Sequence, residues 1–83
     1  ERHEIINQLI KARGYKDYLE VGTDKGDTFS KIEIKNKECC DPVDNISEEY
    51  TFKLDYHMTS DEMFEKMPMY KKYDIIYIVG KDD

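Results

Sequence analysis

From Tyr18 to Thr28 the chain reads Tyr-Leu-Glu-Val-Gly-Thr-Asp-Lys-Gly-Asp-Thr, and the predicted fold is built around these residues. An apolar run ends in an acid and is followed by Gly22 and Gly26. Glycine adopts backbone angles that a Cβ forbids, so the chain can turn sharply here and approach a bound group. Asp27 or Thr28 then caps a helix whose first N–H groups favour an anionic or polar ligand. Strand, glycine turn and helix in this order are typical of the first unit of a nucleotide-binding α/β fold.

One helix is predicted before this unit, and another forms the end of the unit itself. Apolar residues recur at positions 5, 6, 9 and 10, which predicts a short amphipathic helix with Gly14 as its left-handed cap. The helix after the glycine turn is expected to run to about residue 35, and residues 37–41 are predicted to form the second strand, which Pro42 ends.

A third helix is predicted near residue 60. Thr59 and Glu62 have the spacing of a capping box, and Pro68 ends the helix. Its inward stripe is expected to contain Met63, Phe64 and Met67.

Two later segments are predicted strands of different kinds. Residues 50–56 alternate between apolar and polar side chains, which indicates an edge strand with one buried and one solvent-exposed face. Residues 74–80 are apolar on both faces, which indicates a central parallel strand that is covered on both sides. Together these patterns predict a parallel sheet of strand order 3-2-1-4, with helices on both faces, in a single small α/β domain spanning residues 1–83.

Composition narrows the functional classes. The 83 residues carry a net charge of −6, which argues against a nucleic-acid partner. The sequence has neither an apolar run of membrane-spanning length nor a signal-peptide pattern. Cys39 and Cys40 are adjacent and lack a zinc or redox spacing, so we predict no metal site and a reduced, cytoplasmic protein.

Asp41 stands nineteen residues after Gly22, close to the distance at which dinucleotide-binding folds place a ribose-binding acid. The alternative is that Asp41 caps a turn with Asp44 and Asn45. The agreement of two landmarks, the glycine turn and the end of the second strand, favours the ribose role.

These motifs resemble the N-terminal half of a class I S-adenosylmethionine-dependent methyltransferase, of the branch whose first motif reads L-E-x-G-x-x-x-G-x-T. The resemblance rests on residues 18–28, 40–42, 58–64 and 73–80 and covers about half of such a domain. It implies a truncated Rossmann-like three-layer sandwich, with S-adenosylmethionine at the carboxyl ends of the strands.

The resemblance also implies roles for particular residues. The methionine moiety would be held by Glu20 and the glycine loop with Gly22, Thr23 and Gly26, and the ribose by Asp41. Met58, Thr59 and Ser60 would lie against the adenine. The methyl acceptor, expected to be a small molecule, and the catalytic residues are not identified by the sequence.

Two departures from the family bear on activity. Val79 stands where the family's fourth strand carries an acid, and the histidine expected after Gly80 is absent. The second half of the domain, which binds the acceptor, has no counterpart in these residues. The sequence therefore predicts a cofactor-binding half that transfers no methyl group alone. The alternative is a non-catalytic binding or assembly module. We further expect a homodimer formed through the apolar strand 73–80, whose outer edge would otherwise be unpaired.

Overall fold

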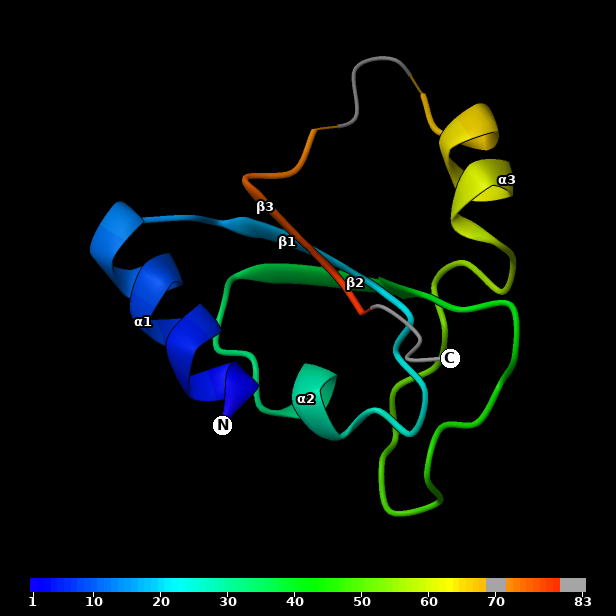
Figure 1. Ribbon diagram of the computed structural model, residues 1–83, viewed down its shortest axis with the longest axis horizontal. Helices are drawn as coiled ribbons and strands as arrows, with labels where there is room; N and C mark the ends of the chain where they lie inside the picture. The colour runs from blue at the N-terminus through cyan, green and yellow to red at the C-terminus, as the bar shows by residue number, and fades with distance from the viewer. Residues whose placement is uncertain (69–71, 80–83) are drawn as a thin grey trace.

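The computed structural model describes residues 1–68 and 72–79. Helices and strands alternate along most of the chain (Figure 1). In order, they are α1 (Arg2–Arg13), β1 (Asp17–Val21), α2 (Asp27–Ser30), β2 (Asn36–Cys40), α3 (Ser60–Lys66) and β3 (Ile75–Ile78). The α/β class predicted from the sequence is confirmed.

The described residues form a parallel three-stranded sheet of order β2-β1-β3. β1 lies in the middle, and its Glu20 is opposite Cys39 of β2 and Tyr77 of β3. The predicted order 3-2-1-4 is wrong, because it requires four strands and the described sheet has three. The sheet does keep the first strand between the second strand and the last one, as that order predicted.

Residues 50–56 do not form the predicted edge strand; among the described residues they share one isolated β-bridge with the sheet, between Cys40 and Tyr56. The reason lies in Asp55, whose carboxylate accepts a hydrogen bond from the Cys39 N–H at 2.8 Å. The backbone N–H groups of Asp55 and Tyr56 both donate to the Cys39 carbonyl oxygen, each at 3.1 Å. The Asp55 carboxylate thus occupies the Cys39 N–H, which a regular β-ladder would use. The β-bridge of the segment to β2 is at Cys40, the last residue of β2.

The first and third helices follow their sequence signals. Gly14 ends α1 in the left-handed conformation with a φ of 67°. At the start of α3, Thr59 accepts from the Glu62 N–H and the Glu62 side chain accepts from the Thr59 N–H, so the capping box is confirmed.

The second helix is shorter than predicted and is capped differently. α2 has four residues, and its N-cap is Gly26 rather than Asp27 or Thr28. The Lys37 ammonium donates to the carbonyl oxygens of Phe29 at 2.6 Å and Ile32 at 3.3 Å. These bonds satisfy carbonyls that a longer helix would use internally, so the chain leaves the helix after one turn.

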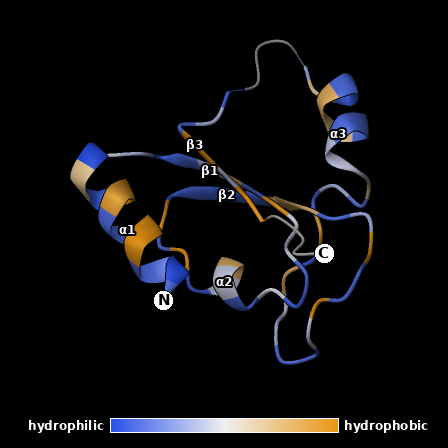
Figure 2. Ribbon diagram, viewed as in Figure 1, coloured by the Kyte–Doolittle hydropathy of each residue, from blue (hydrophilic) through white to orange (hydrophobic). Residues whose placement is uncertain are grey.

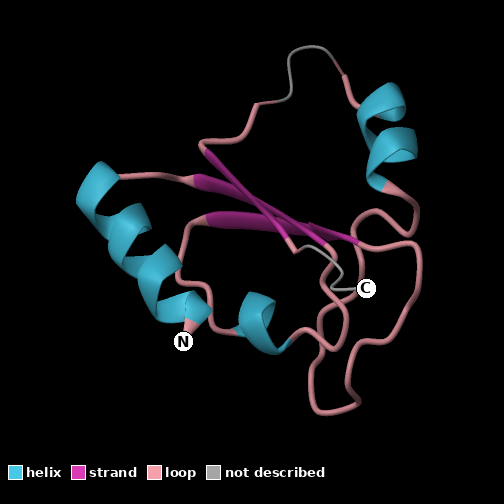
Figure 3. Ribbon diagram, viewed as in Figure 1, coloured by secondary structure: helices cyan, strands magenta, loops and turns pink. Residues whose placement is uncertain are grey.

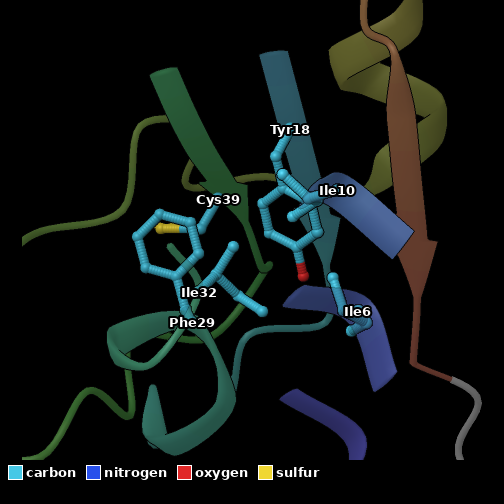
Figure 4. Packing of buried hydrophobic residues seen from close by; sticks show 6 residues of the cluster. All are labelled: Ile6, Ile10, Tyr18, Phe29, Ile32 and Cys39. Carbon is cyan, nitrogen blue, oxygen red and sulfur yellow. The ribbon is translucent and has the colours of Figure 1, made fainter. Parts of the chain in front are cut away.

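Helices contact both faces of the sheet, with α1 and α2 on one side and α3 on the other (Figure 1). Neighbouring residues of one strand point to opposite faces. Tyr18 therefore packs in the first cluster and Leu19 in the second. Figure 4 shows the first cluster, which contains Ile6, Ile10, Tyr18, Phe29, Ile32 and Cys39. The second contains Leu19, Cys40 and Met63.

Two predictions of burial are wrong. Phe64 was expected in the inward stripe of α3, yet it is 46% exposed, because Met63 and Met67 face the sheet instead. β3 was expected to be covered on both faces, yet Ile76 is 43% and Ile78 64% exposed. β3 is an apolar strand (Figure 2) whose partly buried Ile75 and Tyr77 pack against the first cluster. Gly80 lies outside the described residues.

Across the described part of the chain, no helix combines the length and the apolar character needed to cross a membrane.

Candidate functional site

Loops gather beyond the carboxyl ends of β1 and β2 (Figure 3) and enclose a pocket of about 500 Å³. Parallel strands all point to this edge, which is where open α/β sheets bind ligands. Four of the residues predicted from the sequence line the pocket: Gly22, Asp41, Thr59 and Ser60. Its other lining residues are Val21, Asp24, Pro42, Val43, Asn45 and Val79.

Gly22 follows the last residue of β1, and the chain turns there at the carboxyl edge of the sheet. Its φ is 89°, and a Cβ added there would lie 3.2 Å from the carbonyl oxygen of Val79 and 3.3 Å from the Val79 Cβ. The Gly22 N–H donates to the Cys40 carbonyl oxygen at 2.8 Å. Glycine is needed here because the turn is left-handed and is wedged between the ends of β2 and β3.

Asp41 joins the two loops of the pocket. One carboxylate oxygen accepts from the Asp24 N–H and the other from the Val43 N–H, each at 2.9 Å. The bond to Val43 caps a turn at Asp41, whereas the alternative considered from the sequence named Asp44 and Asn45. A carboxylate offers about four lone-pair sites, so two bonds leave acceptor capacity for a ligand hydroxyl.

A smaller pocket of about 190 Å³ adjoins the first and shares Gly22, Asp24 and Val79 with it. Glu20 and Thr23 line this pocket. Both side chains are almost fully buried, with exposed fractions of 1% for Glu20 and 5% for Thr23.

Glu20 is held by neighbouring donors. The Tyr18 hydroxyl donates to Glu20 Oε1 at 2.7 Å. Burial raises the pKa of Glu20, and the Tyr18 and Thr23 hydroxyls and the Lys37 charge counteract that rise. The same burial raises the pKa of Tyr18 and lowers that of Lys37. Glu20 is thus an acid removed from water whose ionisation depends on its partners.

Thr23 Oγ1 is a buried oxygen without a hydrogen bond of satisfactory geometry. It lies near Glu20 and Cys39, where its hydroxyl lowers the pKa of both groups. Among the described residues, no donor or acceptor stands at hydrogen-bonding distance and angle to Thr23 Oγ1. An unpaired buried hydroxyl costs about 1–3 kcal/mol, so a ligand atom that paired with it would regain part of that cost.

Two predicted residues, Gly26 and Met58, line neither pocket. Gly26 packs against Phe52, since a Cβ there would lie 2.5 Å from the ring atom Cζ. Met58 packs against the second hydrophobic cluster, and its carbonyl oxygen accepts from the Cys40 thiol at 3.3 Å.

Asp24 belongs to the glycine turn expected at this edge, but the sequence assigned it no role, and it lines both pockets. Its φ of 50° places it in the left-handed region, and its N–H binds Asp41. The Asn45 side-chain amide donates to Asp24 Oδ1, with 3.4 Å between the Asn45 Nδ2 and Asp24 Oδ1 atoms. Aspartate tolerates this conformation better than most residues, so its position between the two glycines was a usable signal.

Other features of the described residues lie elsewhere. A pocket of about 620 Å³ adjoins the opposite ends of the strands, with Asn36, Glu38 and Tyr73 among its lining residues. One group of side chains, Glu1, His3 and Glu4, has the proximity of metal ligands, but it lies at the start of α1 and lines neither candidate pocket.

Comparison with protein-family models, curated proteins and solved structures finds no match to this chain.

Proposed function

We propose that the carboxyl-end pockets bind S-adenosylmethionine, as the cofactor-binding half of a Rossmann-like small-molecule methyltransferase. The observation that carries the proposal is the larger pocket, where Gly22, Asp41 and the start of α3 meet. Its volume of about 500 Å³ lies within the ~300–1,000 Å³ range of ligand pockets.

The residues present fit the chemistry of this cofactor. Gly22 brings backbone to the pocket without a side chain. Asp41 supplies a carboxylate for the ribose hydroxyls, and Glu20 supplies a buried acid for the ammonium group of the methionine moiety. The bound sulfonium would supply an activated methyl group. The protein's part is then to align that group with an acceptor.

We propose no role for the N-terminus of α2, although the sequence led us to expect one. α2 has a single turn, so its dipole and free N–H groups offer little to an anion. Recognition would depend on carboxylates instead, which suits a cofactor with ammonium and hydroxyl groups.

Binding is expected in the range of ~10 µM to millimolar, about −4 to −7 kcal/mol. Changing Asp41 to Ala should weaken it by roughly 1–3 kcal/mol, because charge-assisted hydrogen bonds are lost. Calorimetry with S-adenosylmethionine and its demethylated product measures both values. Asp44→Ala is the matched control, since Asp44 is an exposed acid in the same loop that lines neither pocket. No heat up to several millimolar ligand would refute the proposal.

We expect no methyl transfer from residues 1–83 alone. Val79 lines both pockets at the position where the family carries an acid, so an acidic group at the end of β3 is missing there. Methylated product above the level of a Gly22→Trp variant would contradict this expectation.

A second candidate is an assembly module that forms a homodimer through β3. The exposed Ile76 and Ile78 favour it, and residues 75–79 carry no charge. On the side away from β1, β3 pairs with no other described strand. An antiparallel two-fold pair centred on Tyr77 would place Ile76 of one copy opposite Ile78 of the other, on the same face.

Light scattering at ~100 µM tests this second candidate, with a dimer mass expected. Ile78→Lys should return the mass to that of a monomer, because a charge would then face the partner strand. Ile5→Lys, at an exposed isoleucine of α1, is the control. A monomer mass for the parent chain would exclude the module as described.

Two free, buried cysteines accord with the cytoplasmic location that we also propose.

A further inference from the structure

Tyr18 and Glu20 form a buried polar pair on one face of β1. Their exposed fractions are 0% and 1%, and the phenol donates to Glu20 Oε1 at 2.7 Å. Figure 4 shows Tyr18 extending through the first hydrophobic cluster, with its hydroxyl oxygen at the far end of the ring. A buried hydroxyl and a buried carboxylate are each costly alone, so the pair satisfies both.

The two residues differ in their relation to the smaller pocket. Glu20 lines it, whereas Tyr18 does not. Tyr18 therefore acts on the carboxylate from inside the protein and occupies one of its two oxygens. The Thr23 hydroxyl, which has no hydrogen-bond partner among the described residues, also lies near the carboxylate and lowers the pKa of Glu20.

We propose that Tyr18 is a positioning residue, which orients the Glu20 carboxylate so that its second oxygen receives a cationic group of the ligand. This inference rests on the proposed function, because the cation is the ammonium group of the methionine moiety. Tyr18 itself touches no ligand. Its effect is to prevent Glu20 from rotating and from being solvated in a different orientation.

Other groups near Glu20 do not replace this role. The Lys37 ammonium is bound to the carbonyl oxygens of Phe29 and Ile32, and it acts on Glu20 through its charge. Cys39 and Tyr77 are opposite Glu20 on the two neighbouring strands, and Arg2 lines the smaller pocket. Tyr18, by contrast, donates a hydrogen bond to Glu20 Oε1 at 2.7 Å.

The test compares Tyr18→Phe with Tyr15→Phe. Both changes remove one hydroxyl and keep the ring, and Tyr15 packs against the same cluster. S-adenosylmethionine affinity should fall about tenfold or more in Tyr18→Phe and stay within about twofold in Tyr15→Phe. In a Glu20→Gln background, Tyr18→Phe should cause a much smaller further loss, because the carboxylate through which it acts is gone.

A second measurement needs no ligand. The NMR titration midpoint of the Glu20 carboxyl should rise in Tyr18→Phe, because the lost donor stabilised the ionised form, and should not move in Tyr15→Phe. If Tyr18→Phe does not fold, the Tyr18 Cζ resonance of the parent should titrate together with Glu20.

The outcomes separate the two proposals. An unchanged Glu20 midpoint, or a Tyr18 resonance that ignores the Glu20 titration, overturns the positioning role. So does equal ligand affinity in Tyr18→Phe and the parent. If the parent binds no S-adenosylmethionine while the Glu20 midpoint rises in Tyr18→Phe, the proposed function fails and the link between Tyr18 and Glu20 stands.

Discussion

Glu20 is the residue whose environment is most at odds with its charge. Glu20 as a whole is 1% exposed, and its pKa is raised, with burial as the main cause. The proton is therefore bound more tightly in the folded chain than in the unfolded chain, where the pKa is about 4.3. The stability that this group contributes is full below about pH 4 and is lost as the pH rises through the folded pKa.

The raised pKa of Glu20 predicts how the stability of the Glu20→Gln variant depends on pH. The variant should gain stability relative to the parent as the pH rises above about 4, and the gain should level off above the folded pKa of Glu20. Urea unfolding between pH 4 and 8 measures the difference. Glu48→Gln, at an exposed acid, should show no such trend. A stability difference for Glu20→Gln that stays constant with pH would contradict the account.

Three glycines offer a graded test of why the turns need this residue. Gly14, Gly22 and Gly26 all have positive φ, so alanine costs each of them about 1–2 kcal/mol of backbone strain. Gly14 has no atom within 4 Å of an added Cβ, whereas Gly22 meets Val79 at 3.2 Å and Gly26 meets Phe52 at 2.5 Å.

We therefore expect the free energy of unfolding to fall least for Gly14→Ala. It should fall further, by an extra ~1–3 kcal/mol, for Gly22→Ala and Gly26→Ala, where the strain is joined by overpacking. Chemical denaturation of the three variants provides the ranking. Equal losses at all three positions would mean that backbone strain alone decides these sites.

At the scale of elements, Asp55 explains why residues 50–56 leave the sheet. Replacing it with alanine leaves the buried Cys39 N–H without its 2.8 Å acceptor, which should cost about 1–3 kcal/mol. Asp44 accepts a long 3.4 Å bond in an exposed loop, so Asp44→Ala should change stability by less than about 0.5 kcal/mol. Thermal unfolding of the two variants checks this, and a neutral Asp55→Ala would show that the contact does not determine the segment's path.

The same elements show how far the sequence predicts this fold. Local signals succeeded where neighbours in sequence settle the structure, as in the Gly14 cap and the capping box of Thr59 and Glu62. They failed where a distant partner intervenes. The alternation of residues 50–56 carries no record that Asp55 binds Cys39. Likewise, the pattern after Asp27 does not reveal that Lys37 will end the helix.

The candidate site divides along similar lines. Gly22 and Asp41 were found because glycine turns and acids at strand ends have a characteristic spacing, and both line the larger pocket. Gly26 carries the same signal as Gly22 but serves packing against Phe52, a contact that spacing does not encode. The partnership of Tyr18 with Glu20 follows the alternation of a strand, yet its significance depends on burial that only the fold reveals.

At the scale of the whole molecule, two clusters on opposite faces of one small sheet are what holds the chain together. The radius of gyration is 12.5 Å, close to the ~12 Å of a compact domain of this length. A chain this short buries only about 60–65% of its unfolded surface. Ligand binding or self-association should therefore raise its stability measurably.

Amide chemical shifts measured during titration with S-adenosylmethionine would show whether a ligand binds at the carboxyl ends of the strands. We expect saturable shifts at Gly22, Asp24, Asp41 and Ser60, which line the larger pocket. Asn36 and Glu38, at the pocket on the opposite ends of the strands, should not move. Shifts confined to that opposite pocket, or none up to several millimolar ligand, would contradict the account.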